Sequence, residues 1–412
     1  MLIHPLGRLL IADPDLDGSL GLNRAPLNSS EPVVNTDIDA AMEFLRIHAA
    51  TPTTQRNYTK EIERLILWSI NVKKKPFSSL SYRDAEEFIG FLSNPDPVEQ
   101  WASLKKFPRE SSDWRPFVAR KEISTHSDNK EKVVAGISPS SQLLSMAILS
   151  SFFAWLVDYN YLSKNPMRQL KVLRKAIRAK DPKAMKPKVE RYLDEEMLAS
   201  LHEAVEMMSK DTQSHQDQYE RAVFIVALML FLAPRAHELA AGAMNDFKAD
   251  GKLWWWNVVG KGSVAAQVPV VEGMLEALIR YRTHLGLSPL PLPDDNSPLL
   301  RSVRTGKPIT TRQLNLILDE LFEAAAKLLL LKADALPASD IIARAEYQTR
   351  AAKIRKASSH WGRHTSITMQ IRSGIPKDIV QKNARHSDSR TTDGYTHEDQ
   401  EYWHSQSQKM HK

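Results

Sequence analysis

The sequence predicts a mainly α protein of two domains with one small antiparallel β-sheet. At 412 residues the chain exceeds the size of an ordinary single domain, so two domains are the better expectation. Apolar residues recur at helical spacing through most of the chain after Asp37. Only residues 252–270, KLWWWNVVGKGSVAAQVPV, alternate as two short strands around a Gly-Lys-Gly turn.

The composition excludes several chemistries. The chain has no cysteine, which rules out disulfides, thiolate nucleophiles and cysteine zinc sites. Its formal net charge of +7 permits a nucleic-acid partner without requiring one. The N-terminus lacks the pattern of a secretory signal, and the longest apolar stretch, Ala222 to Pro234, is too short for a bilayer span. We therefore expect a soluble, cytoplasmic protein without a membrane partner.

The first domain is expected at residues 37–175, after an extended or weakly ordered arm at residues 1–36. Helices are predicted from Asp37, from Thr53, from Ser81 and over residues 138–162. In the second helix Tyr58, Ile62, Leu65 and Ile66 form an apolar stripe, and Arg56, Lys60 and Arg64 are assigned to the opposite face. Residues 94–136 interrupt the helical pattern with four prolines and two tryptophans, which indicates an insertion or long loop.

A basic linker is expected at residues 176–190, followed by a second domain at residues 191–412 with a C-terminal tail. Residues 171–191 carry nine Lys or Arg against two acids, typical of a solvated linker or of a segment lying along a phosphate backbone. The helices predicted in the second domain are Asp194–Ser209, Gln218–Leu232, Val271–Leu285, Thr311–Leu331, Trp361–Ser373 and Pro376–Asn383.

Five short motifs in the second domain carry groups suited to phosphoryl transfer. They are APRAHEL with Arg235, GKG with Lys261, HWGRHT with His360 and Arg363, ARH with His386, and TTDGYTH with Tyr395. Each motif alone is weak, because a turn lysine, a structural arginine or a chance His-x-x-Arg is common. Lys252 and Tyr402 are rivals for the lysine and tyrosine roles.

Together these residues can transfer a phosphoryl group without a metal ion. Two arginines can clamp one phosphate and neutralise the charge that develops on it. A tyrosine hydroxyl can attack phosphorus and form a phosphotyrosyl intermediate. A lysine can protonate the leaving oxygen, and a histidine can accept the tyrosine proton. No carboxylate cluster suited to two Mg²⁺ ions stands out, so no metal or other cofactor is expected.

The order Arg, Lys, His-x-x-Arg, His, Tyr resembles the catalytic signature of the tyrosine recombinases, the phage integrase family. Residues 51–68 and 138–167 are similar to the first and last helices of that family's core-binding domain, so the resemblance spans roughly residues 37–400 without the insertion. It implies a helical core-binding domain and a mixed α/β catalytic domain that form a clamp around DNA.

The resemblance also implies residue roles. Arg235 and Arg363 would bind the scissile phosphate, Lys261 would be the general acid, His360 and His386 would assist, Glu238 would orient the site and Tyr395 would be the nucleophile. The DNA-binding residues would be Thr53, Thr54, Arg56, Lys60, Arg64, Ser140, Lys175, Arg178 and Lys180. The reaction would join and exchange strands of double-stranded recombination sites through a 3′-phosphotyrosyl bond and a Holliday junction, in a homotetramer. The need for accessory DNA-bending or directionality proteins stays open.

Three motifs depart from the family pattern. Ala-Pro-Arg replaces Gly-Leu-Arg at Arg235, Gly362 replaces an aliphatic residue, and Ala384-Arg385-His386 replaces Leu-Gly-His. Two enzymes with related chemistry, a type IB topoisomerase and a telomere-resolving enzyme, are alternatives. A catalytically inactive DNA-binding accessory protein and a basic helical scaffold are alternatives of another class.

Overall fold

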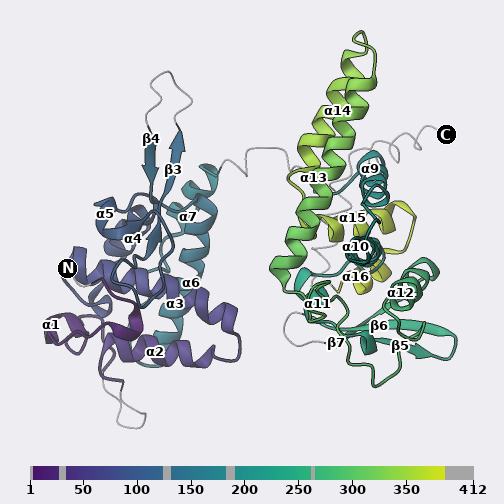
Figure 1. Cartoon of the computed structure of the whole chain (residues 1–412). Helices are drawn as coiled ribbons and strands as arrows, with labels where there is room; N and C mark the ends of the chain where they lie inside the picture. The colour runs from purple at the N-terminus through teal and green to yellow at the C-terminus, as the bar shows by residue number, and fades with distance from the viewer. Residues whose placement is uncertain (1–2, 27–33, 124–130, 182–190, 261–264, 386–412) are drawn as a thin grey trace, which may run out of the picture. The chain divides into compact units, whose positions relative to one another are not determined.

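The computed structural model describes residues 3–26, 34–123, 131–181, 191–260 and 265–385 (Figure 1). The chain divides into two compact units, Met1–Lys188 and Val189–Lys412. Each unit has its own large apolar core. Most of the predicted linker and the predicted site residues Lys261, His386 and Tyr395, with the rival Tyr402, lie outside the described residues.

Unit 1 is built on helices whose starts are marked by capping side chains. Thr36 caps one helix, Ser138 caps another, and Ser81 forms a capping box with Asp84. The apolar faces of these helices meet in a core that contains Trp68, Phe88 and Phe152. The main helices are α2 (Asp37–Ile47), α3 (Pro52–Trp68), α4 (Tyr82–Ser93), α6 (Pro139–Asp158) and α7 (Lys171–Ala179).

The N-terminal segment differs from the predicted extended arm. It contains the short helices η1 (Leu6–Arg8) and α1 (Pro14–Asp17), and Leu6 and Leu9 are buried in the core of unit 1. The amide of Leu6 donates to the buried carboxylate of Glu63 at 2.7 Å. The apolar run near the N-terminus is thus used to cover the core, which the sequence pattern alone did not reveal.

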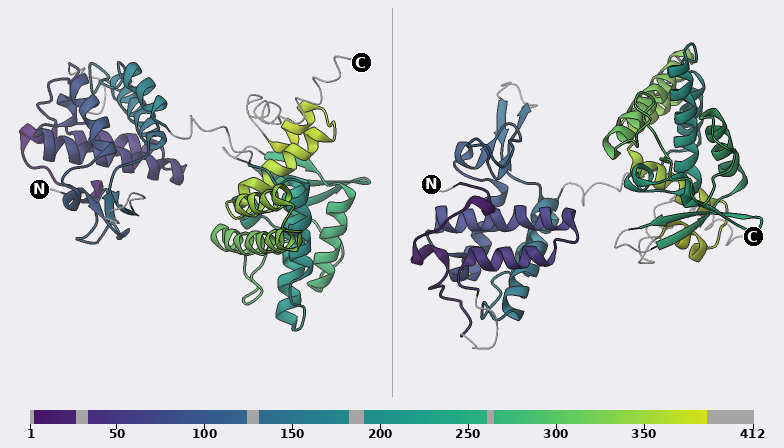
Figure 2. Two further views of the ribbon diagram at one scale, coloured as in Figure 1. Left: turned by 90° about the horizontal axis from the view of Figure 1, so that it is seen from above. Right: turned by 60° about the horizontal axis from the view of Figure 1, so that its bottom comes forward.

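The insertion at residues 94–136 has regular structure of its own. It contains α5 (Val98–Trp101), a parallel pair β1 (Ala102–Ser103) and β2 (Phe117–Val118), and an antiparallel hairpin β3 (Arg120–Ile123) and β4 (Glu131–Val134). Trp101 and Phe117 are buried in the unit 1 core, so the insertion is packed rather than a loop. The hairpin β3–β4 projects beyond the helices of unit 1 (Figures 1 and 2).

Two further sequence expectations need correction. Helix α7 continues to Ala179 and buries Ile177, so the first residues of the predicted linker are helical. The longest uncharged stretch is in α6 rather than at Ala222 to Pro234, and by length and composition α6 could cross a membrane. However, α6 buries Leu149, Phe152 and other side chains in the unit 1 core. The apolar character of α6 is therefore explained by its place in the core of unit 1.

Unit 2 contains the predicted antiparallel sheet, in the order β5-β6-β7. The predicted strands are β6 (Leu253–Val259) and β7 (Ala265–Pro269). A third strand, β5 (Phe247–Asp250), was missed because four residues are too short to show a period. Trp256 pairs with Phe247 on one side and Val268 on the other, and its side chain is fully buried.

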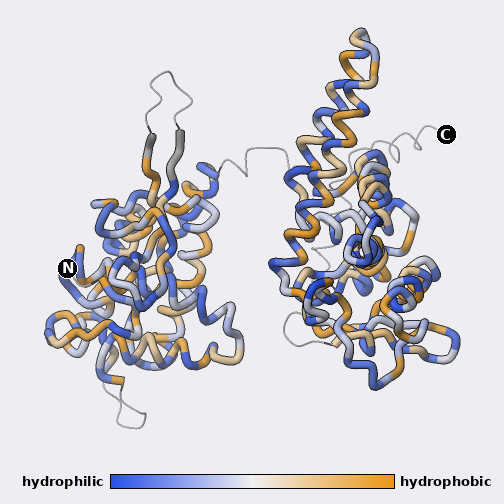
Figure 3. The backbone as a smooth tube through the Cα atoms, viewed as in Figure 1, coloured by the Kyte–Doolittle hydropathy of each residue, from blue (hydrophilic) through white to orange (hydrophobic). Residues whose placement is uncertain are grey.

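Helices surround the core of unit 2. In Figure 3 hydrophobic and hydrophilic residues alternate along α13 and α14, as expected for helices with one buried face. Helix α14 lies within residues 337–359, a basic segment directly before His360. The helices are α9 (Glu195–Glu206), α10 (Gln213–Leu232), α11 (Ala236–Ala241), α12 (Glu272–His284), α13 (Thr311–Ala335), α14 (Ile341–Ile354), α15 (Ser359–Arg372) and α16 (Lys377–Ala384).

Candidate active site

Arg235 lies at the turn between α10 and α11. Helix α10 ends at Leu232, Ala233 adopts the left-handed conformation (φ 46°), and Arg235 is the N-cap residue of α11. Glu238, one turn into α11, binds Arg235 twice. Its carboxylate accepts from the Arg235 amide at 2.7 Å and from Arg235 Nη1 at 2.9 Å. This double contact fixes both the turn and the guanidinium, and about one quarter of the Arg235 side chain remains exposed.

Arg363 lies on α15 and joins the ends of two other helices. Its Nη1 donates to the carbonyl of Ala233 at 2.5 Å, and its Nη2 donates to the carbonyl of Ala384, the last residue of α16. The residue is 2% exposed. A buried guanidinium needs acceptors, and here two carbonyls at helix ends supply them. The two arginines of the predicted clamp therefore come together at the Ala233 turn.

Gly362, which replaces the aliphatic residue of the family pattern, is explained by steric packing. A Cβ atom at Gly362 would lie 2.8 Å from Met229 Cε and 3.2 Å from Met229 Cβ. Met229 belongs to α10, so the absence of a side chain at Gly362 lets α15 approach α10 closely. This approach places the neighbouring Arg363 within reach of the Ala233 carbonyl.

Sequence reasoning missed Arg385 as a member of this cluster. Arg385 ends α16 in the left-handed conformation (φ 54°), and its side chain turns back into the unit. Its Nη2 donates to Glu238 Oε2 and to the Ala233 carbonyl, each at 2.9 Å, and the guanidinium lies 5.2 Å from the ring of Trp256. The signal was present in the sequence, because an arginine replaces the glycine that suits such a backbone conformation.

His360 lies in the first turn of α15, three residues before Arg363. Its ring packs edge-on against His364 at 4.7 Å between centroids. Partial burial lowers the pKa of His360, and the positive charges of Arg363, Arg191 and Arg235 lower it further. A neutral imidazole beside several guanidiniums can accept a proton or a hydrogen bond near neutral pH.

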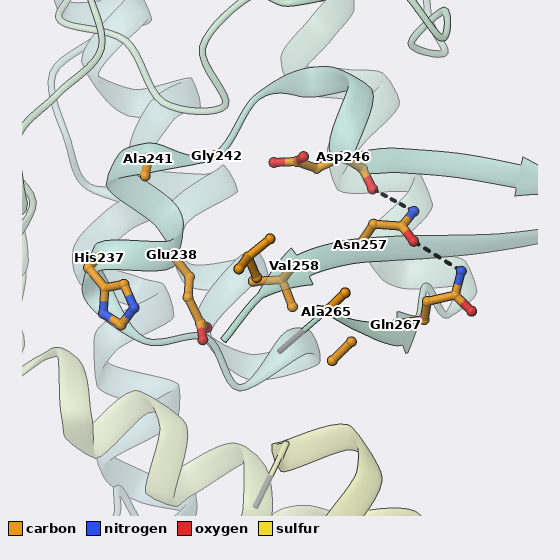
Figure 4. Close-up of a pocket in the computed structure, with 11 residues that line it drawn as sticks. His237, Glu238, Ala241, Gly242, Asp246, Asn257, Val258, Ala265 and Gln267 are labelled. Atoms are coloured by element: carbon orange, nitrogen blue, oxygen red, sulfur yellow. Dashed lines mark hydrogen bonds between the residues drawn. The ribbon is translucent and has the colours of Figure 1, made fainter. Parts of the chain in front are cut away.

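A cavity of about 680 Å³ adjoins this cluster (Figure 4). His237 and Glu238 line it from α11, and Asn257, Val258 and Gln267 line it from the sheet. Gln267 donates to Asn257, which donates to the carbonyl of Asp246, so the polar wall is internally hydrogen-bonded. Val259 and Ala265 also line the cavity, and these are the strand residues on either side of the segment that contains Lys261.

All nine residues predicted to bind DNA lie in unit 1, and most of them are exposed. Thr53, Arg56, Lys60, Ser140, Lys175, Arg178 and Lys180 are exposed and Thr54 is half-buried. Arg64 is the exception, and its predicted place on a solvent-facing surface is wrong. It is 7% exposed, its Nε donates to the carbonyl of Pro116 at 3.0 Å, and its Nη1 pairs with Glu61 at 3.2 Å. Arg64 thus joins α3 to the insertion.

Among the residues that the structure describes, no group of three or more His, Asp or Glu side chains is arranged to hold a metal ion. The charged groups of the cluster are instead Arg235 and Arg385, which pair with Glu238, and Arg363, which binds the Ala233 carbonyl. Such a set favours an anionic ligand, since guanidiniums match the geometry of phosphate oxygens.

Two solved structures resemble the chain in fold. The XerH site-specific recombinase, bound to a palindromic difH substrate in a post-cleavage complex, matches with a TM-score of 0.57 and 13% identity, over 100% of both chains. The Tn1549 transposon integrase, in complex with transposon right end DNA, matches with a TM-score of 0.50 and 16% identity, over 86% of this chain and 94% of that one. At these identities the likeness establishes the fold. No curated protein matches the chain in sequence.

The sequence model of the phage integrase family matches residues 191–402. The match covers more than half of the chain and includes all six predicted catalytic residues. The resemblance of the motifs is thereby confirmed at the level of the family: the chain belongs to the phage integrase family and is a tyrosine-type site-specific recombinase.

Proposed function

We propose that Tyr395 is the nucleophile with which this recombinase cleaves duplex DNA and forms a 3′-phosphotyrosyl bond. Its hydroxyl attacks the scissile phosphorus, the P–O5′ bond breaks, and the 5′-hydroxyl leaves with a proton. The partner strand's 5′-hydroxyl then attacks the phosphotyrosine and restores the diester bond. Two such exchanges pass through a Holliday junction, and no step consumes a nucleotide.

The observation that supports this proposal best is the meeting of two predicted phosphate ligands at one turn. Arg363 Nη1 binds the carbonyl of Ala233, and Arg235 follows two residues later with its guanidinium partly exposed. In this assignment both guanidiniums bind the scissile phosphate and stabilise the charge of the pentavalent transition state. Glu238 acts as a positioning residue for Arg235 because it binds the amide and the guanidinium of that residue.

Proton transfers are assigned to three other residues. Lys261 protonates the leaving O5′ as general acid, and its strands end at the cavity beside Glu238. His386 follows Arg385 directly in sequence and assists phosphate binding and proton transfer with His360. The lowered pKa of His360 supports its role as an uncharged hydrogen-bonding group.

For unit 1 we assign DNA contacts to Thr53, Thr54, Arg56, Lys60 and Ser140, and to Lys175, Arg178 and Lys180 near the linker. Thr53, Thr54 and Ser140 lie in the first turns of α3 and α6, where helix N-termini and hydroxyls suit phosphate oxygens, and Arg56 and Lys60 follow further along α3. Unit 1 would be the core-binding domain and unit 2 the catalytic domain, closing as a clamp on DNA. A homotetramer on two synapsed sites, action on a mobile element and a place at the bacterial nucleoid in the cytoplasm belong to the same proposal.

The test traps the covalent intermediate from a pool of nicked duplexes of randomised sequence, incubated with the full-length protein in EDTA. A nick near the cleavage site releases a short fragment, so rejoining is blocked and the adduct accumulates. We expect a denaturant-resistant adduct that Tyr395→Phe abolishes and the matched variant Tyr402→Phe retains. An adduct that survives Tyr395→Phe, or that requires a metal ion, would overturn the mechanism.

The fate of the trapped DNA separates the recombinase from its nearest alternative. A recombinase transfers the cleaved strand to a second duplex that carries the sequence recovered from the adduct. A type IB topoisomerase would instead relax supercoiled plasmid and give no such exchange. Relaxation without transfer would therefore contradict recombination while leaving Tyr395 as the nucleophile.

A further inference from the structure

We infer that residues 103–118 of the insertion bind the phosphate backbone of duplex DNA, in a cleft that they form with α3. The inference rests on the proposed DNA contacts of α3 and extends them to a segment that the family resemblance does not cover. Its basis is a cavity of about 670 Å³ in unit 1, lined by residues 56–64 of α3 and by residues 103–118 and 135–137.

The insertion is held firmly against α3, so its side chains have defined positions. The Arg64 guanidinium donates to the Pro116 carbonyl and lies 4.3 Å from the ring of Phe117. Arg109 pairs with Glu63 of α3. These contacts cross between the two segments, and the side chains of Arg64 and Glu63 that take part in them are buried, which makes separation costly.

The cleft is strongly basic. Its lining contains the cations of Arg56, Lys60, Arg64, Lys106, Arg109 and Arg115, and only one carboxylate, that of Glu63. Three of the cations are used within the protein, because Arg109 binds Glu63 while Arg64 and Lys60 bind Glu61. Among the described residues, Arg56, Lys106 and Arg115 have no acidic partner.

The three uncompensated cations come from both walls of the cleft. Arg56 belongs to α3, whereas Lys106 and Arg115 belong to the insertion. Arg115 Nη1 donates to the carbonyls of Ser112 and Trp114, which orients the guanidinium without neutralising it. Apolar surface between them, from Phe107 and Pro108, suits the sugars of a nucleic-acid strand. Unpaired cations on two walls match the repeated negative charge of a phosphodiester backbone.

Duplex DNA is the ligand that this arrangement favours. A phosphate backbone is contacted by charge and position and requires no base-reading groups. The exposed polar side chains Arg56 and Lys60 also belong to the helix already assigned to duplex DNA. The insertion would thus increase affinity without adding sequence preference.

The experiment measures the salt dependence of binding of the full-length protein to a random-sequence duplex of about 40 base pairs, long enough to exceed a typical site. For Lys106→Gln/Arg115→Gln we expect the slope of log K against log[salt] to become shallower by about 2, one unit for each lost phosphate contact. The matched control, Arg83→Gln/Lys164→Gln, removes the same charge from exposed residues of unit 1 that lie outside the insertion and do not line the cleft. It should keep the wild-type slope.

Lys106→Gln alone guards against a folding defect, because Lys106 makes no contact that holds the insertion, and its expected change in slope is about 1. Equal slopes for wild type and Lys106→Gln/Arg115→Gln, at unchanged unfolding midpoints, would overturn the inference. The inference would also be overturned if the control variant lost as much of the slope as Lys106→Gln/Arg115→Gln. It would likewise be overturned if the wild type bound single-stranded DNA more tightly than duplex DNA and the cleft substitutions removed that preference. The covalent adduct is scored separately. If the wild type forms the adduct but the cleft variants keep the wild-type slope, only the DNA contact of the cleft is rejected. If the cleft variants change the slope but the wild type forms no adduct, only the catalytic proposal is rejected.

Discussion

The carboxylate of Glu238 lies between the guanidiniums of Arg235 and Arg385. Arg235 Nη1 donates to Oε1 at 2.9 Å, and Arg385 Nη2 donates to Oε2 at 2.9 Å. The carboxylate is fully buried, so its charge must be compensated inside the protein. Because Arg385 directly precedes His386, this pair ties the start of the C-terminal segment to the turn that carries Arg235.

Replacing Arg385 by glycine restores the family's usual residue and removes this tie. In Arg385→Gly, Glu238 and the Ala233 carbonyl each lose a donor, so Arg235 is less firmly held. We expect adduct formation to slow by up to about 10²-fold, the size of effect that a small misplacement of a binding group produces. Single-turnover cleavage of the nicked duplex measures this rate.

Two variants provide the controls for Arg385→Gly. Arg385→Lys keeps the charge and should recover part of the rate, while the loss of the planar fork prevents full recovery. Arg355→Gln breaks a bidentate pair with Glu323 that is exposed on both sides and should leave the rate unchanged. Wild-type cleavage by Arg385→Gly would show that Arg385 has no positioning role.

The electrostatics of His360 give a second prediction. Partial burial and the charges of Arg363, Arg191 and Arg235 lower its pKa below 6.5 in the folded protein. The folded state therefore binds fewer protons than the unfolded state just below pH 6.5, so His360 reduces stability as the pH falls through this window. If cleavage requires the neutral ring of His360, the rate of adduct formation should stay at its neutral-pH value until the pH falls somewhat below 6.5.

Arg191→Gln tests this without altering the proposed phosphate ligands. Removing one nearby positive charge should raise the pKa of His360 and move the acidic limb of the rate profile to higher pH. Nuclear magnetic resonance of the histidine Cε1 protons, assigned with His360→Gln, follows the titration directly. Arg355→Gln, which removes a charge that does not affect His360, should leave the titration unchanged. A shift in both variants, or in neither, contradicts the assigned cause.

The predictable parts of this protein follow from local periodicity and ordered motifs. The helices around Arg363 and the strands around Lys261 were predicted because apolar spacing and a glycine turn mark them. Tertiary contacts determined what was missed. Arg64 has the sequence position of a surface residue, but the insertion covers it through Pro116 and Phe117. Arg385 joins the site only because α16 ends beside α11, which no sequence spacing encodes.

Close packing at Gly362 gives a third prediction. The added methyl group in Gly362→Ala would meet the Cβ as well as the flexible end of Met229, so α15 and α10 must separate. Overpacking costs about 1–3 kcal/mol, and the better helix propensity of alanine returns about 0.5–1 kcal/mol. We expect a net loss of about 1 kcal/mol in the free energy of unfolding, measured with denaturant, and slower cleavage because Arg363 is displaced.

A double-mutant cycle identifies the contact responsible. Met229→Ala alone leaves a cavity in the core, but combined with Gly362→Ala it makes room for the new methyl group. The two effects should therefore be less than additive by at least about 0.5 kcal/mol. Strict additivity would mean that Gly362 is needed for a reason other than the approach to Met229.

The buried carboxyl group of Asp37 gives a fourth prediction, for unit 1. Asp37 accepts hydrogen bonds from the Ser78 amide at 3.0 Å and from the Tyr161 hydroxyl at 2.8 Å. Burial raises its pKa from 3.8 to about 6, although these hydrogen bonds oppose the shift. The folded state thus binds more protons than the unfolded state between these values, and the resulting stability is lost as the pH rises through 6. The total loss from below pH 4 to pH 8 is on the order of 3 kcal/mol, and about half of it occurs above pH 5.

Asp37→Asn removes the titration while keeping an oxygen acceptor. We expect the unfolding midpoint of unit 1 to fall between pH 5 and pH 8 in the wild type, and to fall much less in Asp37→Asn. Asp39→Asn is the matched control, because Asp39 lies on the same helix and is partly exposed. It should retain the wild-type pH dependence. If the unfolding midpoints of the wild type and Asp37→Asn fell equally with pH, another group would be responsible for the proton uptake, and Asp37 would not contribute to the pH dependence of unit 1 stability.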